Sequence, residues 1–143
     1  MLFTRREVSY IGYVKIVKKA LLFNNSLAHP LVPGLLFRTG FEVDLAPDSD
    51  MGLRQLETQA YDITVIIVSH DSESWQLCRK IRSLTTIPLI VISTNAGPDS
   101  CARAIDAGAD YFIRKPFGPL EFLARVNSLM QRSPQRQAIP VGS

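Results

Sequence analysis

Short apolar runs alternate with amphipathic segments along most of this 143-residue chain. The apolar runs are rich in Val, Ile, Leu and Phe and have the length of strands. The segments between them repeat their apolar positions every three or four residues, as helices do. The pattern predicts strands at residues 20–23, 41–45, 63–68, 89–92 and 111–113, and helices at residues 31–38, 50–58, 75–84, 100–107 and 120–131.

The regular strand–helix order predicts an α/β fold, with one five-stranded parallel sheet covered by helices on both faces in a doubly wound (βα)5 arrangement. Residues 63–68 form a continuous β-branched run, which is typical of a central strand. We therefore expect one folded domain at 20–132, an N-terminal extension at 1–19 and a linker or disordered tail at 133–143. Apolar and other residues alternate weakly in the extension. A mobile arm, an extra strand or a partner-binding segment would each fit this pattern.

Charge and composition argue against several classes of function. The net charge is +3, but the extension has five basic residues against one acid, so the remaining residues sum to −1. Nucleic-acid binding needs basic residues grouped on a folded face, and the domain shows no such grouping. No apolar run approaches the roughly 20 residues of a membrane span. Cys78 and Cys101 lack metal-ligand spacing. We expect a cytoplasmic domain that holds no metal and no other cofactor.

Two polar residues stand where the last two strands end. Ser93 follows the strand at 89–92, and Lys115 follows the strand at 111–113. The carboxyl ends of parallel strands meet at one edge of a sheet, which is where open α/β sheets place their binding sites. We therefore expect Ser93 and Lys115 to lie side by side.

Several motifs in a fixed order carry a resemblance to a known family. They are Lys18-Lys-Ala-Leu-Leu-Phe, Gly40-Phe-Glu-Val, Tyr61-Asp62, Ile87-Pro88, Gly108-Ala-Asp110, Lys115-Pro-Phe117 and Glu121-Phe-Leu-Ala-Arg125. From about residue 18 to 132 the chain resembles the receiver domains of two-component response regulators, which have a CheY-like, flavodoxin-like fold. The last motif is most similar to the OmpR/PhoB-type subfamily, whose receivers precede a winged-helix DNA-binding domain.

The resemblance implies a site for phosphoryl transfer to an aspartate, with two acidic residues that hold Mg²⁺ beside it. On this chain the acidic pair falls on Asn24 and Asn25, and the acceptor falls on Ile67. Ser93 and Lys115 keep the family's residue types, and Phe112 occupies an aromatic position that is usually Tyr. Mg²⁺ requires oxygen anions, so we expect neither metal binding nor phosphorylation here. Asparagine carbonyls could instead accept hydrogen bonds from Lys115.

The resemblance also implies an outer face at which two subunits meet. It is formed by the fourth helix, the fifth strand and the fifth helix of the predicted domain. Ordinary surface charge is an equally good explanation of the residues concerned, because exposed ion pairs contribute little. The candidate interface residues are Arg103, Asp106, Asp110, Tyr111, Glu121 and Arg125.

We therefore predict an atypical, aspartate-less pseudo-receiver that is not an enzyme. It would act as a phosphorylation-independent module for signalling and protein–protein interaction, as a homodimer or with a protein partner. It would regulate a transcriptional output domain, and DNA would be contacted only through such a domain. Two alternatives stay open: phosphotransfer to a displaced acceptor, Asp71, or sensing of a small anion or metabolite near Asn24, Asn25, Ser93 and Lys115.

Overall fold

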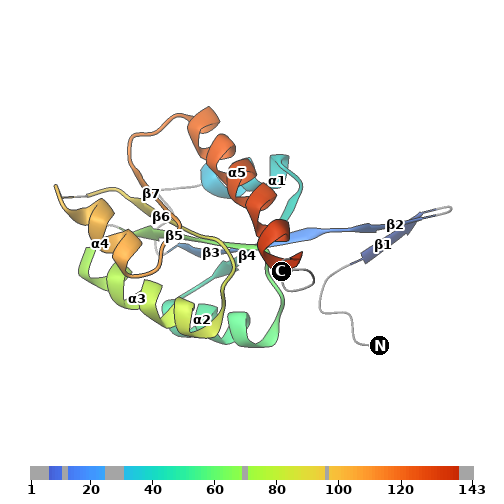
Figure 1. The fold of residues 1–143 in the computed structure, drawn as a ribbon, viewed down its shortest axis with the longest axis horizontal. Helices are drawn as coiled ribbons and strands as arrows, with labels where there is room; N and C mark the ends of the chain where they lie inside the picture. Colours follow the sequence, from blue (N-terminus) through green and yellow to red (C-terminus); the bar gives the residue numbers. More distant parts are fainter. Residues whose placement is uncertain (1–6, 11–12, 25–30, 69–70, 96, 139–143) are drawn as a thin grey trace.

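One parallel sheet of five strands forms the centre of the molecule (Figure 1). The structure, a computed structural model, describes residues 7–10, 13–24, 31–68, 71–95 and 97–138. The strand order is β4-β3-β5-β6-β7, with β5 in the middle and β4 at one edge. The predicted fold class is confirmed. The strands are β3 (Lys18–Asn24), β4 (Phe41–Ala46), β5 (Ile63–Val68), β6 (Leu89–Ser93) and β7 (Tyr111–Arg114).

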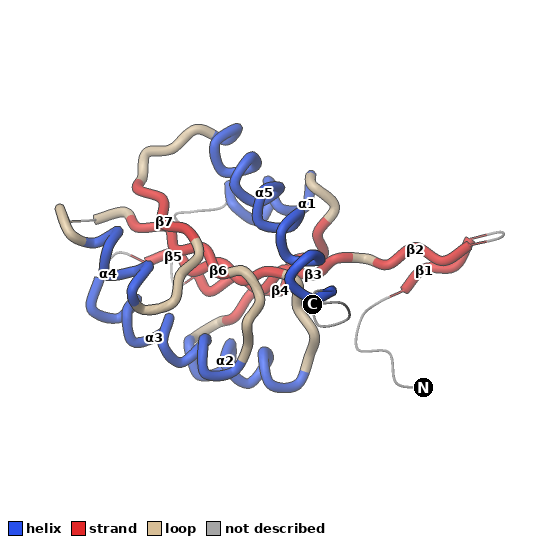
Figure 2. Tube along the Cα trace, viewed as in Figure 1, coloured by secondary structure: helices blue, strands red, loops and turns tan. Residues whose placement is uncertain are grey.

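Five helices cover the two faces of the sheet. Figure 2 shows α1 and α5 on one face and α2, α3 and α4 on the other. Helices cover both faces of the sheet because each strand turns its side chains alternately to the two faces, so both have apolar residues to bury. The helices are α1 (Leu31–Arg38), α2 (Ser49–Thr58), α3 (Asp71–Leu84), α4 (Ser100–Asp106) and α5 (Pro119–Ala138).

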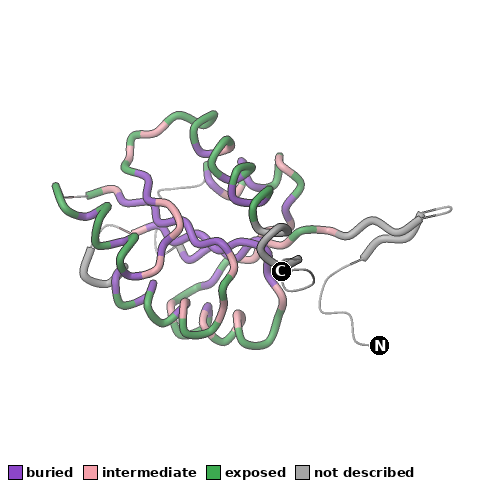
Figure 3. Tube along the Cα trace, viewed as in Figure 1, coloured by how far each residue is buried: buried purple, intermediate pink, exposed green. Residues whose placement is uncertain are grey.

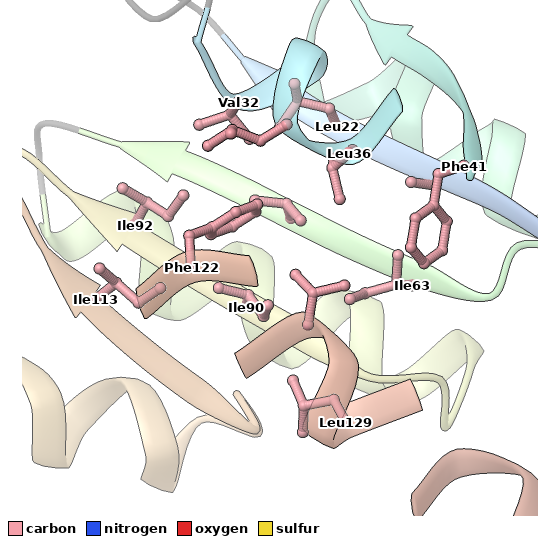
Figure 4. Close-up of a cluster of buried hydrophobic side chains, with 14 of the residues drawn as sticks. Leu22, Val32, Leu36, Phe41, Ile63, Ile90, Ile92, Ile113, Phe122 and Leu129 are labelled. Carbon is pink, nitrogen blue, oxygen red and sulfur yellow. The ribbon is translucent and has the colours of Figure 1, made fainter. Parts of the chain in front are cut away.

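Each face of the sheet has its own hydrophobic core, and the central strands β5 and β6 between them are almost entirely buried (Figure 3). On the α1 and α5 face, Leu36 and Phe122 pack against Ile90 and Ile63 of the sheet (Figure 4). On the other face Ile81 of α3 belongs to the core beneath the helices. This double burial explains why β5 and β6 are continuous apolar runs.

Two helices differ from their predicted bounds by four residues or more at one end. Helix α3 begins at Asp71, four residues before the predicted start. Residues 71–74 are polar, so hydrophobic periodicity gives no sign of them, although polar and acidic residues are common in the first turn of a helix. Helix α5 continues to Ala138, seven residues beyond its predicted end at residue 131, so residues 133–138 of the predicted linker or tail are helical. Gln, Arg and Ala there have high helix propensity, and the helix continues despite Pro134.

An antiparallel hairpin precedes the sheet. Strand β1 (Glu7–Tyr10) pairs with β2 (Tyr13–Ile16), with Glu7 opposite Ile16 and Tyr10 opposite Tyr13. Figure 1 shows the hairpin projecting from the start of β3, away from the helices. Of the possibilities left open for the extension, additional strand structure is the one that forms, as a separate two-stranded sheet.

Arg82 joins α3 to the edge of the sheet at which strands β6 and β7 begin. Its Nε donates to the Gly108 carbonyl at 2.6 Å, and its Nη1 donates to the Ile87 carbonyl at 2.6 Å. Its Nη2 pairs with the Asp110 carboxylate, which also accepts the Leu89 N–H at 2.8 Å. One half-buried side chain thus holds the starts of β6 and β7 in place.

Candidate functional site

The carboxyl ends of β3, β5, β6 and β7 lie side by side, as the sequence predicted. Asn24 pairs in register with Ile67, and Ser93 pairs with both Val68 and Arg114. The Lys115 N–H donates to the Ser93 carbonyl at 2.9 Å, which places Lys115 directly beyond β7 and next to the end of β6. Four strand ends therefore bring one set of predicted site residues to a common edge.

Ile67 stands at the centre of this edge, and its side chain is 4 % exposed. It belongs to the core on the α1 and α5 face, together with Val65 and Ile92. The side chain is a hydrocarbon and has no atom that could accept a phosphoryl group. Asn24 lies in the neighbouring strand, whereas Asn25 lies outside the described residues.

Ser93 is buried, and its Oγ accepts a hydrogen bond from the Asn95 N–H at 3.3 Å. This bond turns the chain at the end of β6. The Lys115–Pro116 peptide bond is cis, and the Lys115 side chain is half-buried. Both residues keep the positions in which they would contact an anion at the sheet edge.

Phe112 of β7 is buried on the opposite face, in the core that contains α3 and α4. The Arg114 guanidinium lies 5.4 Å from the centre of the Phe112 ring. The same guanidinium donates to the Gly97 carbonyl at 3.0 Å, in the loop between β6 and α4. Arg114 thereby covers the ring and ties the loop to β7.

The residues at this edge do not suit Mg²⁺. A hard divalent cation takes oxygen ligands, usually including carboxylates. The described edge has an asparagine, an isoleucine, a serine and a lysine cation at these positions, and none of them is a carboxylate. Within the described residues no group of three or more His, Cys, Asp or Glu side chains could hold a metal ion. The donor set supports hydrogen bonding to an anion and does not support metal-assisted phosphoryl transfer.

The sequence of residues 25–127 matches the family model of the response regulator receiver domain. This chain belongs to that family. Response regulator ArlR of Staphylococcus aureus (strain Mu50) is 32 % identical over 107 residues, which are 74 % of this chain and 49 % of that protein. ArlR of Staphylococcus saprophyticus is 30 % identical over 102 residues, which are 71 % of this chain and 46 % of that protein. The receiver thus spans about half the length of these curated relatives.

Solved structures agree with this assignment. A response regulator from Thermotoga maritima superposes with a TM-score of 0.72 at 26 % identity, over 80 % of this chain and 98 % of that one. A CheY-like receiver domain protein from Methanospirillum hungatei JF-1 superposes with a TM-score of 0.75, over 84 % of this chain and 98 % of that one. At 22 % identity, the latter likeness shows the fold alone. In the described part of the receiver no helix is long and apolar enough to cross a membrane.

The α4–β7–α5 face brings most of the predicted interface residues to one surface. The Arg125 guanidinium lies 4.3 Å from the centre of the Tyr111 ring, in cation–π contact. Arg103 pairs with Asp99 at 2.9 Å at the start of α4, and this bond holds the pKa of the Asp99 carboxyl below its usual range. The remaining charged residues of the face, Asp106 and Glu121, are exposed.

Two predicted residues are placed differently from what we expected. Asp110 binds Arg82 and the Leu89 N–H within the subunit through its Oδ2, a role that the predicted interface did not include. Asp71 is the first residue of α3 and does not lie in a loop. The cause in both cases is a tertiary or capping environment that the spacing of motifs does not reveal.

Sequence patterns did not identify Arg82 or Arg114, although each makes several contacts. Arg82 stands in an amphipathic helix, where an arginine normally indicates a solvated side. Its one signal was its place four residues after Cys78, on the side of the helix that packs inward. The one sequence signal for Arg114 was that it follows the buried Ile113 in the same strand, so that its side chain points to the other face of the sheet.

Proposed function

We propose that this receiver transmits signals without aspartyl phosphorylation, as a protein–protein interaction module of a pseudo-receiver type. The observation that carries the proposal is the buried Ile67 side chain at the position of the phosphoacceptor. The fold persists because its apolar positions persist, whereas the charges needed for phosphoryl transfer do not. Acyl phosphate formation requires a carboxylate nucleophile, and metal binding requires anionic oxygen ligands. We further propose that the domain catalyses no reaction of its own.

Association through the α4–β7–α5 face is the mechanism that we propose. The face combines exposed apolar side chains, Leu120 at 81 % and Ile105 at 45 %, with the charges of Arg125 and Glu121. An arginine that stacks on an aromatic ring keeps its N–H donors available for a carboxylate. In a two-fold dimer each such contact occurs twice. The charges would set the orientation, and the apolar residues would supply buried area.

The output of the receiver is the second part of the proposal. Curated relatives are about twice as long as the region that matches this chain. A subfamily of the winged-helix type, in which a cytoplasmic receiver controls DNA binding by a second domain, fits this difference. Contact with DNA would then belong to the output domain, because residues 20–143 carry a net charge of −1.

Incubation with acetyl phosphate and Mg²⁺ tests the phosphorylation part. We expect no phosphoryl adduct by intact-mass spectrometry, while a receiver that retains its acidic residues is labelled in parallel. A stoichiometric adduct on this chain would refute the proposal. If an adduct appears and Asp71→Asn abolishes it, Asp71 is the acceptor, and the protein is a phosphotransfer receiver.

Sedimentation over a range of protein concentrations tests the association. We expect a reversible monomer–dimer equilibrium that Arg125→Glu weakens at least tenfold. Arg79→Glu is the matched control, because Arg79 is an exposed arginine of α3 on the other face of the sheet. A monomer at all concentrations, or equal effects of the two variants, would contradict the α4–β7–α5 dimer.

A further inference from the structure

A cavity of about 170 Å³ lies between α2, α3 and the carboxyl ends of β3 and β5. It is separate from the α4–β7–α5 face and lies beside the edge that carries Ile67. In another protein an engineered apolar cavity of about 150 Å³ admits benzene. This cavity therefore has room for one ring-sized group. Its lining residues are Phe23, Ser49, Ile66, Ile67, Val68, Gln76, Leu77 and Lys80.

The floor of the cavity is formed by apolar side chains. Phe23 and Ile66 come from adjacent strands, and Leu77 closes the space from α3; all three side chains are buried. The Phe23 ring lies directly against the backbone of α2 at Gly52, where a Cβ would be 2.1 Å from ring atom Cε2. The ring is thus held against α2, which leaves the remaining space on the side of α3. These side chains form an apolar floor beneath a largely polar lining, so the cavity suits a ligand that combines an apolar body with a polar group.

The rim of the cavity supplies hydrogen-bond donors and one cation. Ser49 is the first residue of α2, and Gln76 and Lys80 lie one turn apart on α3. Lys80 is the one charged residue among those that line the cavity. No ion pair joins Lys80 to another residue within the described part of the chain, although Asp50 and Glu57 border the outer groove behind it. A cation beside two neutral donors favours an anionic group.

We propose that this cavity binds a small organic anion with a flat apolar body, of the size of an aryl monocarboxylate. The ring enters between Phe23 and Leu77, and the carboxylate pairs with the Lys80 ammonium at the rim. Such a ligand joins α2, β5 and α3 in one contact. The proposal goes beyond phosphorylation-independent association and does not depend on the dimer.

Benzoate is the probe, added to the full 143-residue chain in an NMR titration of methyl groups. We expect saturable shifts of Ile66, Val68 and Leu77, with a Kd that Lys80→Gln raises about tenfold. Arg79→Gln, the neighbouring exposed position, is the control and should leave the Kd unchanged. Benzylamine, which has the same ring and the opposite charge, should not bind.

Three results would overturn this assignment. They are the absence of saturable binding, an equal Kd in wild type and Lys80→Gln, or equal binding of benzylamine. Leu77→Phe, which places a ring into the cavity, provides a second check and should abolish the shifts of Ile66. The charge variants lie on the surface, so their comparison decides the proposal even where Leu77→Phe does not fold.

Discussion

Gly52→Ala is expected to destabilise the receiver, although alanine is the better helix former. Gly52 is the fourth residue of α2 and is buried. A Cβ at this position would lie 2.1, 2.5 and 2.8 Å from three atoms of the Phe23 ring. The ring is 4 % exposed and belongs to the core beneath α2 and α3, so it cannot turn outward without leaving that core.

The magnitude follows from two opposing effects. Insertion of a methyl group into a packed core costs about 1–3 kcal/mol. Contacts below 3 Å place this site at the upper end, because the Phe23 ring would have to leave α2 and move into the cavity that it lines. Alanine recovers about 1 kcal/mol of helix propensity over glycine. The free energy of unfolding should therefore fall by about 2 kcal/mol.

Gly34→Ala is the matched control, because Gly34 is the fourth residue of α1 and a Cβ there would meet no neighbouring group within 4 Å. Here only the propensity effect acts, so the free energy of unfolding should rise by about 0.5–1 kcal/mol. Urea unfolding, followed by the fluorescence of the single tryptophan, Trp75, measures both. The double variant Phe23→Leu/Gly52→Ala should recover at least about 1 kcal/mol relative to additivity. Equal stabilisation by both glycine variants would refute the reasoning.

Three further predictions concern the site and its support. Ile67→Asp should lower the free energy of unfolding by about 3–5 kcal/mol at pH 7. Burial raises the pKa of such a carboxyl above its unfolded value, so the loss should shrink as the pH falls towards about 4, and a pH-independent loss in urea unfolding would contradict this. Burial raises the pKa of the Cys78 thiol to about 11, whereas Cys101 is exposed. At pH 8 a disulfide reagent should therefore modify one thiol rapidly and the second only after unfolding; equal rates would exclude this difference. Arg82→Met should cost about 2–3 kcal/mol, because it removes the donor that two carbonyls share and the cation that pairs with the Asp110 carboxylate. Arg79→Met, at an exposed position of the same helix, should change stability by less than about 0.5 kcal/mol in the same assay.

The α/β fold could be predicted because its apolar positions are periodic. Residues 63–68 have the pattern of a central strand because both faces of β5 are covered, and 41–45 have the pattern of an edge strand because β4 is one. Helix ends were predicted less well. The start of α3 and the end of α5 depend on polar residues whose helical and loop propensities differ little, and hydrophobic periodicity does not report on them.

The meeting of Ile67, Ser93 and Lys115 at one edge also followed from the sequence, since parallel strands end at the same side of a sheet. The use of Asp110 did not. Its motif indicated a surface residue, but Arg82, which is 28 residues away in the chain, binds its carboxylate within the subunit. Only the packing of α3 against the starts of β6 and β7 decides such a pairing.

The sequence by itself thus determined the alternation of strands and helices and the receiver family's motifs, because these depend on residue type and on spacing along the chain. It also predicts the loss of the phosphoacceptor, which the labelling experiment tests. Tertiary structure decided what lies between the elements. The cavity beside Lys80 is lined by residues of β3, α2, β5 and α3, the Phe23 ring rests against a glycine of α2, and Arg125 of α5 covers Tyr111 of β7. Such contacts join residues that are distant in sequence, so local sequence patterns do not predict them.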